Sequence, residues 1–386
     1  MTKSPFKIIW VNSADDIDST LWNECFSKDI EGYWWYKTLE QSKLDDQFQF
    51  LYGVLLQNKI PIGIVPCFIM AVPIELVLPD FISSIVRKIG QYIPSFLHQR
   101  TLFIGSPCID EGHIGIKPGL NLNTLVPIIN EACEQRAKES HTPLLVWKDF
   151  SNDYSSALSQ LTSDYGMIKA ISFPGTTLHL DKFNSYESYL NSLSGMHRHN
   201  FKKHVSKSKN LIELDTTIVT MPDDVLIDEI FDLFWGTYLK GKTKFEQLNK
   251  TFFINISRLP TSIYIILRDQ KTNKLVAFML CFRLNSKIIN KFIGIDYTQP
   301  KETSLYYRLW EEAVTWAIKS GVNELQSGQT GYSIKMRTGN ELVPLFNYIK
   351  HRNIFINWIF KLIAKHINWA TLDEDLKPYN HKKNRN

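Results

Sequence analysis

The sequence predicts an α/β protein of the α+β kind, with two similar domains that each hold a mixed, mostly antiparallel sheet flanked by helices. Three observations lead to this fold class. The chain has 386 residues, which suits two domains of ordinary size. Apolar residues make up 44% of it, enough for large cores. The order of one helix, two or three strands, a helix and a strand occurs once in each half.

The first half alternates between strand-like apolar runs and amphipathic segments with the period of helices. The expected strands are Phe6–Val11, Gln49–Leu56, Ile62–Met70, Thr101–Gly105 and Pro143–Phe150. The expected helices are Asp15–Phe26, Tyr33–Leu44 and Asn123–Glu139. The apolar stretch 60–78 is nearly long enough to span a bilayer, but its three prolines and Glu75 favour two buried strands with a turn.

The second half repeats this order. The expected helices are Asp223–Leu239 and Ser304–Ser320, and the expected strands are Ile263–Arg268, Leu275–Arg283, Ile288–Ile295 and Asn323–Gln326. The repetition predicts an internal duplication with domains at 1–165 and 216–350. Residues 166–215 are expected to form a connecting strand and a basic helix, and residues 351–386 an amphipathic helix and a basic tail that is disordered after Pro378.

Charge and cysteine content indicate a cytoplasmic protein. The formal net charge of +5 is mild and does not by itself favour nucleic acid as a partner. The five cysteines lie far apart and form no C-x-x-C pair, as suits a reducing compartment. The N-terminal residues contain no apolar signal-peptide segment.

The segment His197–Lys209 is strongly basic, with five Lys or Arg residues, three histidines and no acid. On a helix, Arg198 and Lys202 would share one face, and Lys203 and Lys207 would share another. Such a helix could bind phosphate or carboxylate through Arg198, Lys202 and Lys203, or it could be an ordinary solvated face. A metal site of its three histidines has no acid or cysteine to support it.

The glycine-rich segment Gln326–Gly339 follows a strand and is expected to be a loop that serves either as an ordinary connection or as an anion site. Its candidate site residues are Gly328, Gln329, Tyr332, Lys335 and Arg337. If the loop is extended, Lys335 and Arg337 would face the same side, and a turn would separate them.

Two carboxylates, Asp296 and Glu302, flank the end of a predicted strand and could act as a general base. Ordinary positions in a turn and in the first turn of a helix explain them as well. Farther along the chain, the amphipathic stretch 354–369 could rest on a membrane surface or cover a core. The acidic residues 373–375 that follow weigh against the membrane.

Several short motifs, in this order, resemble the FemAB-like branch of the GNAT acyltransferase superfamily, often labelled peptidoglycan biosynthesis or recognition proteins and close to the CelD-like acyltransferase domain. The motifs are Trp35–Ser42, Tyr189–Ser194 followed by Arg198 and Lys202–Lys203, Phe234–Tyr238, Thr251–Phe253, Leu275–Phe278, Phe292–Gly294 and Tyr306–Tyr307. The closing motif G-x(6)-K-x-R-x-G is similar to Gly328, Lys335, Arg337 and Gly339. After Gly339 the chain departs from the family pattern.

The resemblance implies tandem GNAT-like domains and transfer of an acyl or aminoacyl group to a small amine. The donor would be acyl-CoA, acyl carrier protein or aminoacyl-tRNA, a co-substrate rather than a bound cofactor, and direct attack would need no metal. Lys335 would contact the donor, and Arg337 would tie the segment to Glu302. Two other functions stay open, namely a non-catalytic module that recognises cell-wall or anionic ligands, and a nucleic-acid-binding protein.

Overall fold

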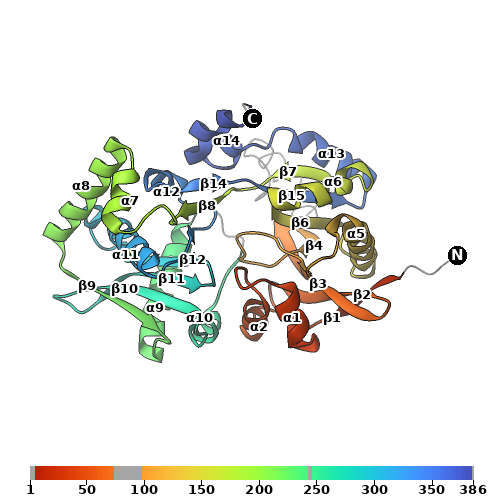
Figure 1. Ribbon diagram of the computed structural model, residues 1–386, viewed down its shortest axis with the longest axis horizontal. Coiled ribbons are helices and arrows are strands. Elements are labelled where there is room, and N and C mark those ends of the chain that lie inside the picture. The colour runs from red at the N-terminus through yellow and green to blue at the C-terminus, as the bar shows by residue number, and fades with distance from the viewer. Residues whose placement is uncertain (1–4, 74–97, 242–245, 385–386) are drawn as a thin grey trace. The chain divides into compact units, whose positions relative to one another are not determined.

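The computed structural model describes residues 5–73, 98–241 and 246–384, which fall into two compact units. The first unit comprises Met1–Pro174 together with Val343–Asn386, and the second comprises Gly175–Leu342. Each unit is built around one sheet (Figure 1). None of the described helices is long and apolar enough to cross a bilayer.

The first sheet has the strand order β1-β2-β3-β4-β6-β15-β7, and β5 pairs with β3. Its strands are β1 (Phe6–Val11), β2 (Gln49–Gln57), β3 (Ile60–Pro73), β4 (His98–Ile104), β5 (Gly115–Ile116), β6 (Leu144–Ser151), β7 (Ile168–Ile171) and β15 (Leu345–His351). The expectation of two strands within 60–78 is wrong as far as Pro73, because β3 runs unbroken to that residue and pairs with β2 on one side and β4 on the other. The rest of that stretch lies outside the described residues.

Helices cover this sheet and shield its apolar residues. They are α1 (Ser19–Cys25), α2 (Tyr33–Gln41), α5 (Leu122–Glu139), α6 (Ser155–Ser163), α13 (Ile354–Ala364) and α14 (Trp369–Leu372), with short 3-10 turns η1 (Ala14–Asp16), η3 (Asn152–Tyr154) and η5 (Glu374–Asn384). Leu102, Trp147 and residues of α5 and α6 form one continuous core. The tail expected to be disordered forms η5 instead, which the fully buried Leu376 anchors.

The second sheet has the order β14-β8-β13-β12-β11-β10-β9. Its strands are β8 (Gly175–His179), β9 (Leu214–Thr220), β10 (Ser262–Asp269), β11 (Leu275–Arg283), β12 (Lys287–Ile295), β13 (Glu324–Gln326) and β14 (Glu341–Val343). The central strand β11 is buried along nearly its whole length, as its unbroken apolar sequence predicts.

Two groups of helices lie on opposite faces of this sheet. One face carries α7 (Tyr186–Ser192), α8 (Gly195–Leu211) and α11 (Leu305–Lys319), and the other carries α9 (Asp224–Lys240) and α10 (Lys250–Ser257). Two short helices, η4 (Lys301–Thr303) and α12 (Tyr332–Arg337), complete the unit. Side chains alternate along β10, so Ile263 and Ile265 join the core under α8 and α11. On the other face, Gly294 lets α9 approach closely, since a Cβ there would lie 2.8 Å from the backbone of Leu233.

The two sheets share one strand order, which confirms the internal duplication. The first sheet has the order β1-β2-β3-β4-β6-β15-β7, and the second, listed from its other edge, has the order β9-β10-β11-β12-β13-β8-β14. In both sheets the fourth and fifth strands run parallel, β4 with β6 in the first and β12 with β13 in the second. The sixth position shows a reciprocal strand exchange. After β7, the edge of the first sheet, the chain enters the second sheet as β8, and after β14 it returns to the first sheet as β15.

Candidate functional site

The second sheet opens beside an irregularity in β12. β12 pairs with β13 only over Lys287–Ile289, although it continues to Ile295. Directly after this pairing, the register between β11 and β12 shifts and Lys291 becomes the extra residue of a bulge. A bulge bends its strand and redirects backbone groups. β13 ends at Gln326, so from Asn290 onward β12 continues past the end of β13, and among the described strands none pairs with β12 on this side beyond Ile289.

Helix α11 follows β12 in the chain and contacts both β12 and β13. Its first turn is preceded by Ser304, which has a left-handed backbone with φ 47° and ψ 42°. This conformation is uncommon for a residue with a side chain. The hydroxyl of Ser304 lies 2.9 Å from Nδ1 of His204, which extends from α8. The positive end of the α11 dipole thus meets the basic helix.

His204 lies flat on the ring of Tyr307 in the first turn of α11, with ring centroids 4.3 Å apart. Partial burial lowers the pKa of His204 below its usual value of 6.5, and three nearby cations lower it further. These cations are Lys203, Lys207 and Arg337. Both influences favour the neutral form of His204.

We refer to Lys203, His204, Lys207 and Arg337 as the basic cluster. The three permanent cations in it are exposed, and within the described ranges no ion pair joins any of them to an acid. Neighbouring positive charges without a counter-charge repel one another and favour a bound anion. The cluster thus has the electrostatics of a phosphate site at the start of α11.

Arg198 and Lys202 lie on a different face of α8. Arg198 donates to the carbonyl of Asn191 at 3.2 Å, and Lys202 forms an ion pair with Glu187 at 3.4 Å. Lys202 also lines a pocket of about 430 Å³ between α7 and α8, together with Glu311. Of the three cations that the sequence put forward as an anion site, the structure places only Lys203 in the basic cluster.

Lys335 is a buried residue of α12, so the expectation that this segment is a loop is wrong over Tyr332–Arg337. Gly331, with φ 66°, precedes this short helix. The ammonium group of Lys335 donates to the carbonyl of Ser327 and, at 3.3 Å, to that of Gly328. Thr176 donates to the same two carbonyls. Lys335 therefore fixes the turn between β13 and α12.

The other candidates in this segment are divided by the helix. Tyr332 is fully buried, whereas Gln329 is half-buried in the turn. Arg337 is exposed and belongs to the basic cluster. The expected ion pair between Arg337 and Glu302 is absent from the part of the chain that the structure describes, because η4 leaves Glu302 exposed to solvent.

Asp296 directly follows β12 and is buried. Lys274 forms an ion pair with it at 2.8 Å, and the backbone and hydroxyl of Thr298 donate to its second oxygen. Burial is the largest single influence and acts to raise the pKa, but these hydrogen bonds together outweigh it and lower the pKa of Asp296. A carboxylate held in this way is a poor proton acceptor, so Glu302 is the more available of the two.

A buried arginine near the basic cluster, Arg308, was not predicted from the sequence. Arg308 is 6% exposed, and its Nε and Nη1 atoms have no hydrogen-bond partner within the described residues. Its Nε atom lies 3.6 Å from Glu311 in the next turn of α11. Its burial results from tertiary packing rather than from the sequence of α11, so no local pattern could identify it.

The histidines of α8 do not assemble into a metal site. His204 stacks on Tyr307, whereas His197 lines a separate pocket of about 540 Å³ with His179 and Glu341. Within the described residues, no group of three side chains suited to metal ligation comes together.

Comparison with known protein families finds a match. The family described as FemAB-like, peptidoglycan biosynthesis/recognition, matches residues 112–370, about two thirds of the chain. The search of curated proteins finds no match.

Solved structures with a similar fold include two proteins that align over most of this chain. The crystal structure of FemX has a TM-score of 0.56 at 10% identity, covering 92% of this chain and 100% of FemX. A tandem GNAT protein from the clavulanic acid biosynthesis pathway has a TM-score of 0.52 at 8% identity, covering 90% of this chain and 99% of that protein. At these identities, the likeness establishes the tandem GNAT-like fold alone.

Proposed function

Because the chain belongs to the FemAB-like family of peptidoglycan biosynthesis/recognition proteins, we propose that it transfers an acyl or aminoacyl group from an activated carrier to an amine. The observation that carries this proposal is the opening of β12 beside the basic cluster. It combines a backbone that has left its neighbouring strand with a positively charged helix start. Acyl-CoA and acyl carrier protein carry phosphate at the other end of the pantetheine arm from the thioester, and aminoacyl-tRNA carries phosphate near its ester, so each donor offers an anion for the basic cluster.

In the proposed reaction, the donor's phosphate binds the basic cluster and its carbonyl lies along β12 beyond Ile289. The amine attacks this carbonyl, so a C–N bond forms and the C–S or C–O bond to the carrier breaks. Backbone N–H groups of the opened segment stabilise the oxyanion. The amine gives up its proton to water or to Glu302, and the departing thiolate or alkoxide takes up a proton. Holding both reactants in this orientation supplies much of the rate.

The proposal assigns Lys335 a positioning role rather than contact with the donor. Its ammonium group holds the carbonyls of Ser327 and Gly328 directly after β13. β12 pairs with β13 only as far as Ile289, opposite the last residue of β13. A fixed turn at this point holds the end of β13 in place beside the proposed donor site.

A donor screen tests the function. The protein is incubated with acyl-CoA, acyl carrier protein or aminoacyl-tRNA in the presence of EDTA and peptidoglycan peptides that carry a free amine, and donor loss is followed by mass spectrometry. We expect one donor class to be consumed with formation of an amide. Activity that vanishes in EDTA and returns with zinc contradicts direct attack, and binding without any turnover favours a recognition module of the same fold.

A further inference from the structure

Helix α13 presents an apolar stripe to solvent. Ile354 is 86% exposed, Phe355 66%, Trp358 54% and Leu362 41%. Positions 354, 358 and 362 are spaced by four residues and therefore lie along one side of the helix. Phe355 and Trp358 stack on each other, with ring centroids 6.1 Å apart. Large apolar side chains that adjoin one another on a helix are normally buried, so their exposure here indicates a binding surface for a membrane or another molecule.

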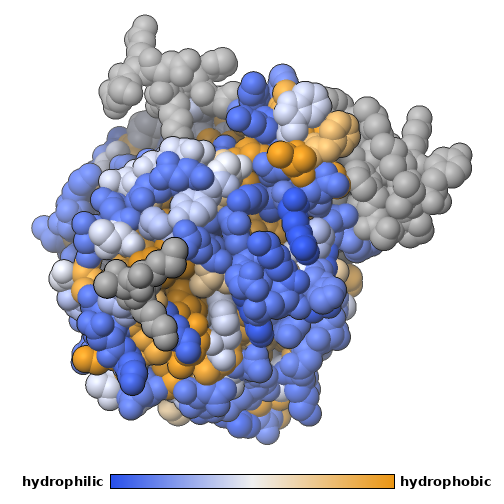
Figure 2. Space-filling view, turned by 90° about the vertical axis from the view of Figure 1, so that its right-hand side faces the viewer, coloured by the Kyte–Doolittle hydropathy of each residue, from blue (hydrophilic) through white to orange (hydrophobic). Residues whose placement is uncertain are grey.

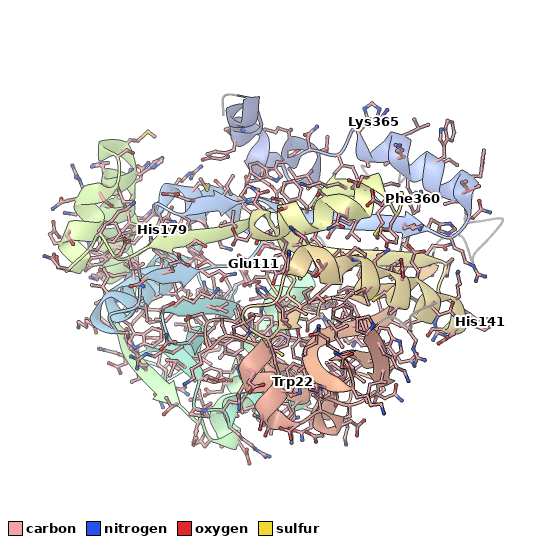
Figure 3. All side chains as sticks on the ribbon, turned by 45° about the vertical axis from the view of Figure 1, so that its right-hand side comes forward. Trp22, Glu111, His141, His179, Phe360 and Lys365 are labelled. Carbon is pink, nitrogen blue, oxygen red and sulfur yellow. The ribbon has the colours of Figure 1, made fainter. Side chains whose placement is uncertain are left out.

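The opposite side of α13 is firmly attached to the first unit. The amide of Asn357 donates to the carbonyl of Gly166 at 3.4 Å, and its oxygen accepts from the backbone of His351 at 2.9 Å. Phe360 packs edge-on against His351, with ring centroids 5.9 Å apart. In Figure 3, Phe360 and Lys365 point to different sides of this helix. The apolar stripe is therefore held outward by a fixed helix.

Positive charge accompanies the stripe. Lys361 is exposed on α13, and Arg352, Lys365 and His366 are exposed just beyond its ends. Within the described ranges, no acid forms an ion pair with Lys361 or Lys365. The acidic residues 373–375 follow α13, and Glu374 there pairs with Lys377 rather than with α13. Figure 2 views the molecule from the side on which α13 lies and shows hydrophobic residues exposed at the top of this face.

The combination fits a lipid surface better than a protein partner. An 11-residue helix is about 16 Å long, and its four exposed apolar residues present on the order of 500 Å². A stable protein interface needs ~800 Å² from each partner. A bilayer interface accepts a single amphipathic helix, with aliphatic and aromatic side chains inserted and lysines among the headgroups.

We propose that α13 docks the protein on an anionic lipid bilayer, with Ile354, Phe355, Trp358 and Leu362 inserted at the interface. Lys361 and Lys365 then lie at the level of the negatively charged headgroups. This inference stands apart from the proposed acyl transfer, because it uses neither the basic cluster nor β12. Docking adds no spanning segment, since the helix lies in the plane of the surface.

Flotation of the intact chain with vesicles tests the docking. The probes are vesicles of phosphatidylcholine alone and vesicles that also contain phosphatidylglycerol. We expect flotation with the anionic vesicles, weakened by added salt, and little with phosphatidylcholine. The double variant Phe355→Ser, Trp358→Ser should lower the apparent affinity about tenfold or more, and Lys361→Gln, Lys365→Gln should lower it on anionic vesicles in particular.

The matched control replaces two equally exposed apolar residues of the second unit, Met221→Ser and Val225→Ser, which are 59% and 72% exposed. This variant should float like the unchanged protein, and circular dichroism should show all variants folded. Equal flotation of the Phe355, Trp358 variant overturns the proposal, as does a failure of the unchanged protein to float. Self-association in sedimentation that this variant abolishes, without vesicle binding, would instead assign the stripe to contacts between copies of the chain.

Discussion

His204 and Tyr307 lie face to face, with their rings 4.3 Å apart and their planes 6° from parallel. This stack fixes the basic side of α8 on the first turn of α11, more than a hundred residues later in the chain. The stack therefore holds Lys203 and Lys207 of α8 near the first turn of α11, where they form the basic cluster with Arg337.

The basic cluster predicts which cations bind the donor. Arg337→Met should weaken binding of coenzyme A or inorganic phosphate roughly fivefold, or about 1 kcal/mol, because an exposed charge contributes modestly. Lys202→Met is the control, since Lys202 is already paired with Glu187. Calorimetric titration at two salt concentrations measures both. An equal loss in the two variants would remove the cluster from the site.

Lys335 predicts a loss of stability rather than a loss of turnover alone. Lys335→Met removes two hydrogen bonds from the buried turn at Ser327 and Gly328 and should cost about 1–3 kcal/mol. Arg337→Met changes an exposed side chain and should stay within about 0.5 kcal/mol. Urea unfolding compares the two. If the Lys335→Met protein is as stable as the unchanged chain, Lys335 does not stabilise this turn, and direct contact with the donor becomes the better explanation of its position.

Two glycines of the second unit should respond in opposite directions. Gly294→Ala places a Cβ against Phe278 and the backbone of Leu233, which should destabilise the protein by about 1–3 kcal/mol. Gly236→Ala lies within α9 with nothing inside 4 Å of the new atom, and should stabilise it by up to ~1 kcal/mol. Thermal unfolding measures the melting temperature of each variant. A melting temperature that shifts in the same direction in both variants would contradict the close approach of α9 to Gly294.

His204 predicts a pH dependence with a definite sign. Its folded pKa is lowered below 6.5, so the unfolded chain binds the proton more readily and stability is lost as pH falls below 6.5 toward the folded pKa. His204→Gln should flatten part of this slope. Bound phosphate should raise the pKa of His204, which proton NMR can follow. A pKa that phosphate leaves unchanged would place the anion elsewhere.

Local patterns predicted individual elements well. The strand at Leu275–Arg283 agrees with β11 at both ends, because an apolar run bounded by polar turns determines it. The segment after residue 166 was harder to predict. It was expected to hold a strand and a basic helix, but it contains β7, β8, α7, α8 and β9. β7 has only four residues and β8 five, too short for periodicity to reveal.

The site was predictable only as far as helix faces. The spacing of four residues places Arg198 and Lys202 on one face of α8 and Lys203 and Lys207 on another. Which face meets α11 depends on tertiary packing around Phe201 and Val205, so the sequence could name Arg198, Lys202 and Lys203 as anion-site candidates but could not show that only Lys203 lies in the basic cluster. Pairing of β15 with β6, about 200 residues earlier in the chain, is likewise a long-range choice that no local window contains.

A ribosome releases the first part of this chain well before the strand that completes its sheet. Among the described strands, β7 pairs only with β15, so it joins the first sheet once β15, which ends at residue 351, has emerged. At ~5–20 residues per second, the interval between the two strands is about 10 to 35 s. During this time β6 carries an open edge of the kind that attracts other chains. The nascent protein is therefore expected to depend on chaperones until translation is nearly finished, and a fragment of residues 1–174 would lack β15, the strand that holds β7 in the first sheet.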